Sequence, residues 1–343
     1  MTTRMRAEIE EQPAAVAATL DALLPLAGEI ERLAAGTRSV LFIARGSSDN
    51  AAVYGQYLCS VRGGRLATLA SPSVATAYRA SVDLEGVLAV AVSQSGRTDE
   101  IVATQDWARA CGARTVAITN DGASPLATRA DLALVTRAGE ELAVPATKTF
   151  TTQLAALAVL GLAGDRDGLE ALRAVPEALD RALGAAEAAE ALAIRLTYVR
   201  RLVVSARGFA YAVAREVALK LEEACYVTAL GLSYADLEHG PIAVVDGHTP
   251  AVLLAAAEDE AMLGPMAALA ARCRAEGAPV YGVGGDAAFA AACDLVLPEA
   301  ALPAWLSPLT LVVPGQLLTE ALARAKGIDP DRPRALRKVT QTS

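Results

Sequence analysis

The sequence predicts an α/β fold made of two tandem subdomains, each a doubly wound parallel sheet flanked by helices. Short, continuous apolar runs such as "VLFIA" and "VLAVAV" alternate with alanine-rich stretches that favour helices. A strand that is apolar throughout is buried on both faces, as happens in parallel sheets covered by helices. The second observation that supports this fold class is an internal repeat.

The repeat consists of three pairs of similar segments in the same order. "VLFIARG" at residues 40–46 matches "LVVSARG" at 202–208, "GARTVAI" matches "GAPVYGV", and "DLALV" matches "DLVLP". The three offsets are 162, 165 and 163 residues. Ordered matches at nearly one offset indicate a duplicated α/β unit of about 150 residues.

The domain boundaries follow from this repeat. We expect an N-terminal helix at 1–36, a first subdomain at 37–163, a helical connector at 164–195, a second subdomain at 196–326 and a C-terminal tail at 327–343. Each subdomain is predicted as strand, helix, strand, helix, strand. Ligands of such sheets bind at the carboxyl ends of the strands.

Composition excludes several classes of function. A net charge of −8 disfavours a nucleic-acid partner. The five cysteines show no paired spacing, which is typical of reduced thiols in a cytoplasmic protein. No apolar run approaches the roughly 18 residues that span a membrane, and the start lacks a signal peptide. We therefore expect a cytoplasmic protein with no membrane partner.

The strand in "GVLAVAV" runs into the polar loop "SQSGRT" at residues 93–98. The loop supplies the hydroxyls of Ser93, Ser95 and Thr98, and Ser48 follows the neighbouring strand. The next segment predicts a helix, whose free N–H groups and partial positive charge attract a phosphate. The alternative is an ordinary helix cap with surplus hydroxyls. Nucleotide-binding glycine motifs are absent, and the equivalent end "LLAAAED" in the second half lacks hydroxyls.

A second group of polar residues lies in "EVALKLEEACYVTALGLSYADLEHGP". Lys220 and Glu223 are placed near the end of a predicted helix, and His239 follows before a Gly-Pro turn. A carboxylate, a lysine and a histidine can support proton transfer. The alternative is a solvated helix face and a histidine that caps a turn. The basic tail "DPDRPRALRKVT" is either disordered or folds back to bring Lys338 into a site.

Together these segments resemble the sugar isomerase (SIS) family, specifically the isomerase domain of glucosamine-6-phosphate synthase. The resemblance covers about residues 30–343 and rests on "ARGSSDN", "SQSGRTDE", "AGEELAVPATKTFTTQ", "ALKLEEACY", "LEHGP" and "DPDRPRALRKVT". It implies two SIS subdomains, a phosphosugar substrate, no cofactor and no metal. It also implies a homodimer with active sites at the subunit interface.

The resemblance also implies roles for individual residues. The phosphate would be held by Ser48, Ser93, Gln94, Ser95 and Thr98. Glu223 would move a proton between C2 and C1, and His239, reaching in from the partner subunit, would open the sugar ring. Lys220 would stabilise the acyclic sugar, while Lys338 would contact the sugar and close the site. Val144 and Thr147 would line the sugar.

Several features depart from the synthase pattern. The chain starts with a short helix where the synthase has a glutaminase domain, so we expect no amino-sugar synthesis from glutamine. Arg97 replaces an acid in the phosphate loop, Glu222 replaces a lysine beside the base, and Pro145 and Ala146 replace small residues in the sugar-lining segment. These changes could alter which substituent is accepted at C2.

The expected chemistry begins with proton abstraction at C2 and then branches. A free amine at C2 leads to a glucosamine-6-phosphate deaminase that yields fructose 6-phosphate and ammonia. An N-acetyl group leads to a dehydratase that eliminates the C3 hydroxyl of N-acetylglucosamine 6-phosphate. The remaining alternatives are a plain phosphosugar isomerase and a non-catalytic phosphosugar sensor.

Overall fold

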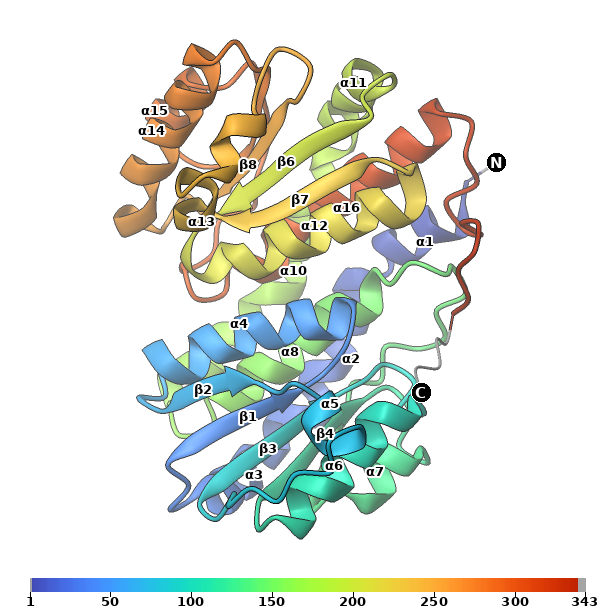
Figure 1. Ribbon diagram of the computed structural model, residues 1–343, viewed down its shortest axis with the longest axis vertical. Helices are drawn as coiled ribbons and strands as arrows, with labels where there is room; N and C mark the ends of the chain where they lie inside the picture. Colours follow the sequence, from blue (N-terminus) through green and yellow to red (C-terminus); the bar gives the residue numbers. More distant parts are fainter. Residues whose placement is uncertain (1, 339–343) are drawn as a thin grey trace. The chain divides into compact units, whose positions relative to one another are not determined.

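The computed structural model describes residues 2–338, which form two compact units. The first unit comprises residues 14–141, 148–174 and 337–338, and the second comprises 2–13, 142–147 and 175–336. Each unit is a parallel sheet flanked by helices (Figure 1). The predicted fold class is confirmed.

The first unit contains a parallel sheet with the strand order β2-β1-β3-β4-β5. Its strands are β1 (Ser39–Ile43), β2 (Leu66–Leu69), β3 (Val87–Val92), β4 (Arg114–Thr119) and β5 (Leu132–Val135). The strand order reverses direction between β1 and β3, which pair up to Ile43 and Ala91 at their carboxyl ends. Loops leaving neighbouring strands toward opposite sides open a crevice at such a switch point.

Helices cover both faces of this first sheet. They are α2 (Gln12–Leu23), α3 (Ala27–Ala34), α4 (Ser47–Val61), α5 (Ser73–Thr76), α6 (Asp99–Ala110), α7 (Pro125–Arg129), α8 (Lys148–Gly161) and α9 (Arg166–Ala171), with 3-10 turns η1 (Leu24–Leu26) and η2 (Leu172–Ala174). Residues of α6 and α7 share a buried cluster with Ile43. On the other face α4 meets the Phe42 ring so closely that a Cβ at Gly55 would lie 2.8 Å from it.

The second unit repeats the same sheet, in the order β10-β9-β8-β6-β7. Its strands are β6 (Arg201–Ala206), β7 (Thr228–Ser233), β8 (Ala251–Ala255), β9 (Val280–Gly284) and β10 (Leu295–Leu297). The segments matched by sequence fall on equivalent strands: β1 and β6, β4 and β9, β5 and β10. The predicted duplication is therefore confirmed, and "SQSGRT" after β3 is equivalent in position to the segment after β8.

Helices also cover both faces of the second sheet. They are α1 (Arg4–Glu10), α10 (Val175–Ala182), α11 (Ala186–Leu196), α12 (Tyr211–Cys225), α13 (Tyr234–Glu238), α14 (Glu260–Ala275), α15 (Ala287–Ala291) and α16 (Ser307–Ala325), with 3-10 turns η3 (Leu183–Ala185), η4 (Gly208–Ala210) and η5 (Pro241–Val244). Residues of α14 and α15 pack with Val203 and Leu253 of the sheet. Helices α12 and α16 pack against each other, where a Cβ at Gly315 would lie 2.3 Å from Val217.

Two strands, β2 and β7, were not predicted from the sequence, because neither lies in a continuous apolar run. Both are edge strands, and each has exposed positions within it. A strand that is half covered needs apolar residues on one face only, so the pattern that detects fully buried strands misses it.

One segment corrects the expectation about apolar runs. Residues Gln12–Ala34, which form α2, η1 and α3, are long and apolar enough by composition to cross a membrane. In the structure Val16, Leu20 and Ile30 are buried, whereas Asp21 and Glu29 are exposed. The apolar side chains named here therefore pack inside the protein, while the two acids face solvent.

Candidate active site

The loop after β3 is folded by its own hydroxyls. Ser93 is buried and its Oγ accepts the N–H of Gly96 at 3.3 Å, while Ser95 Oγ accepts the N–H of Arg97 at 3.2 Å. The carbonyl of Gln94 accepts the N–H of Asn120 at 3.0 Å. These bonds curl the loop into a compact turn fixed to the end of β4.

Gly96 is required by the geometry of this turn. It has a φ of +62°, a left-handed conformation that residues with a Cβ rarely adopt. A Cβ at this position would also lie 2.2 Å from Ser124 Oγ and 2.8 Å from Thr119 Oγ1. The loop therefore packs its backbone directly on the β4 loop, and only glycine fits there.

Two helices begin beside this turn. Helix α6 starts after Thr98, which occupies the N-cap position without making a side-chain capping bond. Helix α4 starts at Ser47 after β1, and Ser48 in its first turn is buried. Because β1 and β3 are neighbours, the positive ends of both helices lie at the carboxyl edge of one sheet. Because the Thr98 hydroxyl makes no capping hydrogen bond, the alternative that the loop hydroxyls serve only as a helix cap is weakened.

Two ion pairs connect the loops at this edge. Arg45, after β1, donates two hydrogen bonds of 3.0 and 3.1 Å to Glu100 in the first turn of α6. Arg97 pairs at 2.7 Å with Asp121 in the β4 loop. That bond from Arg97, with the N–H of Ala123, holds the pKa of the Asp121 carboxyl below its usual value. Arg97 thus joins two loops and is itself exposed.

The tail residue Lys338 forms an ion pair with a buried carboxylate in the same unit. Its Nζ donates to Glu141, whose side chain is fully buried. Glu141 also accepts the N–H of Thr149 at 3.0 Å and the hydroxyl of Thr149 at 2.6 Å, at the start of α8. Burial raises the pKa of Glu141, but Lys338 and the Thr149 bonds outweigh it, so the carboxyl pKa lies below its usual value.

Helix α12 of the second unit carries a row of three charged residues. Lys220, whose side chain is 2% exposed, donates to Glu223 and lies 3.6 Å from the fully buried Glu216. The side chain of Glu223 is 23% exposed. The row follows from the i, i+4, i+7 spacing, which places all three on one helix face. A buried ammonium between two carboxylates is compensated, and one of the two carboxylates remains open to solvent.

Glu222 and His239 are not part of this row. Glu222 is exposed and accepts the N–H of Ala229 in β7 at 3.4 Å. His239 caps α13 and is also exposed. Within residues 2–338, its side chain makes no hydrogen bond or ion pair with Glu223. Glu223 precedes β7 and His239 follows it, so the six residues of this strand, about 20 Å, separate them.

The segment 142–147 is anchored within the second unit. Buried Glu8 of α1 accepts the N–H groups of Leu142 and Ala143. The Val144 N–H donates to the carbonyl of Asp331 at 3.1 Å. Thr147 is fully buried, and its carbonyl accepts Gln316 Nε2 of α16 at 3.2 Å.

Sequence reasoning missed two buried acids. Glu216 lies one turn before Lys220 in the quoted segment, and its helical spacing to Glu223 was the available signal. Glu141 lies in the quoted motif "AGEELAVPATKTFTTQ", but its partner Lys338 is 197 residues away, which no local pattern could indicate. Within residues 2–338, no group of three or more His, Cys, Asp or Glu side chains is arranged to hold a metal ion.

These features define a protein of two duplicated, doubly wound α/β domains with a hydroxyl-rich loop at one switch point. The family model described as "SIS domain" matches residues 35–163. The chain belongs to the SIS-domain family, and the predicted resemblance is confirmed.

Similar proteins include sugar-phosphate enzymes. The chain is 34% identical to glutamine–fructose-6-phosphate aminotransferase (isomerizing) of Pyrococcus horikoshii over 97% of this chain and 57% of that protein. The chain thus spans little more than half the length of the curated relatives it matches. A protein from Silicibacter pomeroyi, provisionally assigned as a phosphosugar isomerase, has a crystal structure with 34% identity and a TM-score of 0.81, covering 96% of this chain and 100% of that one.

A third similar protein is a glucosamine-6-phosphate deaminase from Thermotoga maritima. Its crystal structure is 25% identical to this chain, with a TM-score of 0.78 and coverage of 99% of this chain and 100% of that one.

Proposed function

We propose that the protein is a phosphosugar enzyme that acts on an amino-sugar 6-phosphate. Its most direct activity would be deamination of glucosamine 6-phosphate with water to fructose 6-phosphate and ammonia. The observation that carries this proposal is the row on α12, a buried lysine held between two carboxylates, one of them partly exposed. The names of the similar enzymes support the substrate class.

In this proposal the phosphate is held by the hydroxyl-rich edge of the first sheet. Ser48, Ser93, Gln94, Ser95 and Thr98 supply neutral donors, and the starts of α4 and α6 supply partial positive charge. Neutral donors with helix dipoles bind a dianion without a dedicated cation. Binding energy from this remote group would position the sugar for reaction.

The proton transfer is assigned to Glu223. It removes the C2 proton of the open-chain aldehyde. The electron pair of that bond forms the C1–C2 double bond, and the carbonyl π pair moves to oxygen, which takes up a proton to give an enolamine. The enolamine is then protonated at C1 while its nitrogen loses a proton, which leaves an imine at C2. Water adds to this imine, and ammonia leaves as the ketone of fructose 6-phosphate forms. Lys220, protonated beside Glu223, would stabilise the negative charge that develops on the acyclic sugar.

We also propose a homodimer in which His239 of the partner subunit opens the sugar ring. The length of β7 supports this, since it separates Glu223 from His239 of the same chain. Lys338 would contact the sugar once released from Glu141, and Val144 and Thr147 would line it. A cytoplasmic location is part of the same proposal, because phosphosugars are charged intracellular metabolites.

The test is to incubate the full chain separately with glucosamine 6-phosphate and N-acetylglucosamine 6-phosphate. We expect ammonia and fructose 6-phosphate from the first substrate. Ultraviolet absorbance of an unsaturated sugar from the second would instead indicate the dehydratase. Interconversion of glucose 6-phosphate and fructose 6-phosphate without ammonia release would indicate an isomerase. Phosphosugar binding without product in any of these assays would indicate a sensor.

A further inference from the structure

The first unit contains a pocket at the end of its sheet opposite to the hydroxyl-rich loop. It encloses about 250 Å³ and is lined where α3, α4 and α8 end, at Ala34, Arg62 and Gly161. Helix α4 connects the two regions, because Ser48 lies in its first turn and Arg62 is its C-cap. At 15 residues this helix is about 22 Å long, so the pocket is distinct from the candidate active site.

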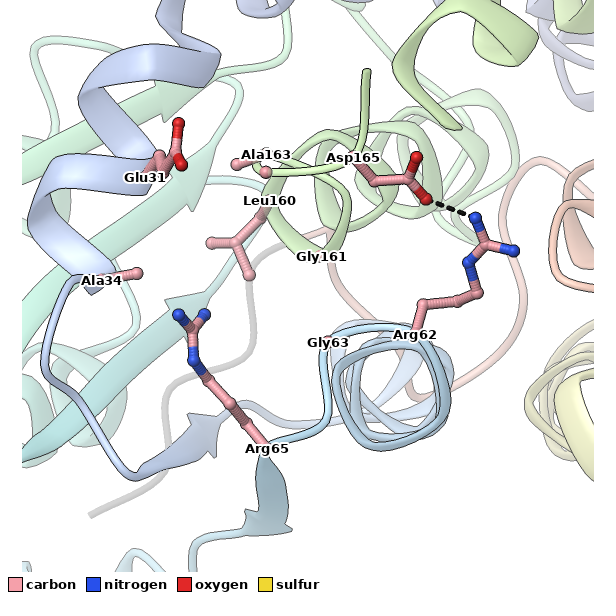
Figure 2. A pocket seen from close by; sticks show the side chains of 10 residues that line it. Glu31, Ala34, Arg62, Gly63, Arg65, Leu160, Gly161, Ala163 and Asp165 are labelled. Carbon is pink, nitrogen blue, oxygen red and sulfur yellow. Dashed lines mark hydrogen bonds and ion pairs between the residues drawn. The ribbon is translucent and has the colours of Figure 1, made fainter. Parts of the chain in front are cut away.

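Figure 2 shows that the pocket presents opposite charges from different elements. Arg62 of α4 is engaged with Asp165. Arg65, just before β2, and Glu31, on α3, also face the pocket. Within residues 2–338, neither Arg65 nor Glu31 has an ion-pair partner, and they do not pair with each other. The pocket therefore contains one cation, Arg65, and one anion, Glu31, that could each pair with a ligand.

The surrounding backbone favours a positive group over a dianion. The three helices end at this pocket, and a helix C-terminus carries a partial negative charge. A phosphate dianion would meet this charge with a single unpaired guanidinium to offset it. A carboxylate bound to Arg65 and an ammonium close to Glu31 and the negative helix ends would satisfy both sides.

The size of the pocket fits a small metabolite. A volume of 250 Å³ corresponds to about eight water molecules at roughly 30 Å³ each. Leu160, Ala34 and Ala163 add an apolar wall beside the two charges. From these observations we propose that the pocket binds a small α-amino acid, with its carboxylate on Arg65 and its ammonium on Glu31. Such a ligand would be an effector, since the site is remote from the hydroxyl-rich loop.

The test uses the full chain and does not depend on catalytic activity. The twenty L-amino acids are screened by thermal shift, and L-leucine is titrated by calorimetry beside isopentylamine and 4-methylpentanoate, which each lack one charge. We expect at least one amino acid to bind with a Kd below about 10 mM, and each single-charge analogue to bind at least about tenfold more weakly. Arg65→Gln and Glu31→Gln should each weaken amino-acid binding at least about tenfold.

Arg109→Gln is the matched control, because Arg109 is an exposed arginine of the same unit that pairs with Asp131 away from the pocket. It should leave the affinity unchanged. Circular dichroism verifies that each variant is folded. The proposal is overturned if no amino acid binds, or if binding survives both charge substitutions. It is also overturned if inorganic phosphate binds in an Arg65-dependent way while the amino acids do not.

Discussion

Lys338 of the C-terminal tail forms an ion pair with Glu141, a carboxylate fully buried at the start of α8. The two residues are 197 positions apart in sequence. Thr149 completes the surroundings of Glu141 with two hydrogen bonds. Lys338 therefore compensates the charge of this buried acid within the first unit.

Replacing this cation should change how stability depends on pH. In the wild type the pKa of Glu141 is lowered, so its ionised carboxylate contributes to folding stability. This contribution is present above about pH 4.5 and is lost as the pH falls. In Lys338→Met the charge of Lys338 no longer opposes burial, and the two Thr149 bonds remain, so the pKa of Glu141 rises above its wild-type value and its ionisation stabilises the fold less as the pH increases. We expect a loss of about 3 kcal/mol at pH 8 and a much smaller loss near pH 4.5. Urea unfolding at both pH values measures it.

Arg337→Met is the control, since this neighbouring cation is exposed. Its effect should be small at both pH values. An equal loss for Lys338→Met at pH 4.5 and pH 8 would contradict the electrostatic role of the pair.

Glu223→Gln should abolish turnover while leaving the phosphosugar bound. An amide cannot accept the C2 proton, so we expect the rate of ammonia release to fall by a factor of about 10²–10⁴. Glu222→Gln, one residue earlier and exposed, should change the rate little. Full activity in Glu223→Gln would remove this carboxylate from the role of base.

The charge row on α12 should behave as one unit. Lys220→Met removes the ammonium beside the buried Glu216, and we expect it to cost about 3 kcal/mol of folding stability. Glu216→Gln leaves Lys220 paired with Glu223, so we expect a smaller loss. The double variant should cost less than both together, with a coupling of about 1–3 kcal/mol. The exposed pair Glu177 and Arg181, also at i, i+4, should couple by less than about 0.5 kcal/mol. Additive losses at Glu216 and Lys220 would show that the two side chains act independently.

Gly96→Ala should damage the phosphate loop beyond the cost of backbone strain. Gly36 is a matched control, because its φ is +75° but a Cβ there would have no neighbour within 4 Å. We expect Gly36→Ala to cost about 1–2 kcal/mol. Gly96→Ala should cost more and should also weaken phosphosugar binding, because its Cβ would collide with Ser124. Equal effects of the two substitutions in unfolding and binding assays would argue against close packing of this loop.

The ionised carboxylate of Glu299 should lower the folding stability in alkaline solution. Burial raises the pKa of its carboxyl to about 7, with the bond from the Ala257 N–H opposing the shift. Because the pKa of Glu299 is higher in the folded protein, its protonated form contributes to folding stability. This contribution is fully present below about pH 4.5 and is lost as the pH rises through 7. Glu299→Gln should therefore be more stable than the wild type by about 2–3 kcal/mol at pH 8.5 and similar to it at pH 4.5.

Exposed Glu276 gives the control variant Glu276→Gln, for which we expect no pH-dependent gain. Thermal unfolding midpoints at the two pH values compare the variants. A gain for Glu299→Gln that is the same at pH 4.5 and 8.5 would rule out ionisation as its cause.

Much of the fold was predictable because its signals are local. Continuous apolar runs identified the buried strands, and three ordered matches identified the duplication, which the equivalent strands of the two sheets confirm. The edge strands β2 and β7 were not predicted, because partial exposure interrupts the apolar pattern. The apolar character of Gln12–Ala34 was also underestimated, because isolated charges such as Asp21 interrupt an otherwise apolar segment.

The sequence by itself determined the parallel α/β class, the repeat and the hydroxyl-rich loop, since each depends on residues close together in the chain. Only the tertiary structure decided that Lys220 is buried between Glu216 and Glu223, and that Lys338 pairs with Glu141. The physical reason is that burial and ion pairing depend on which distant side chains meet and how much water is excluded. The sequence names a charged residue but does not show whether its side chain is solvated or buried.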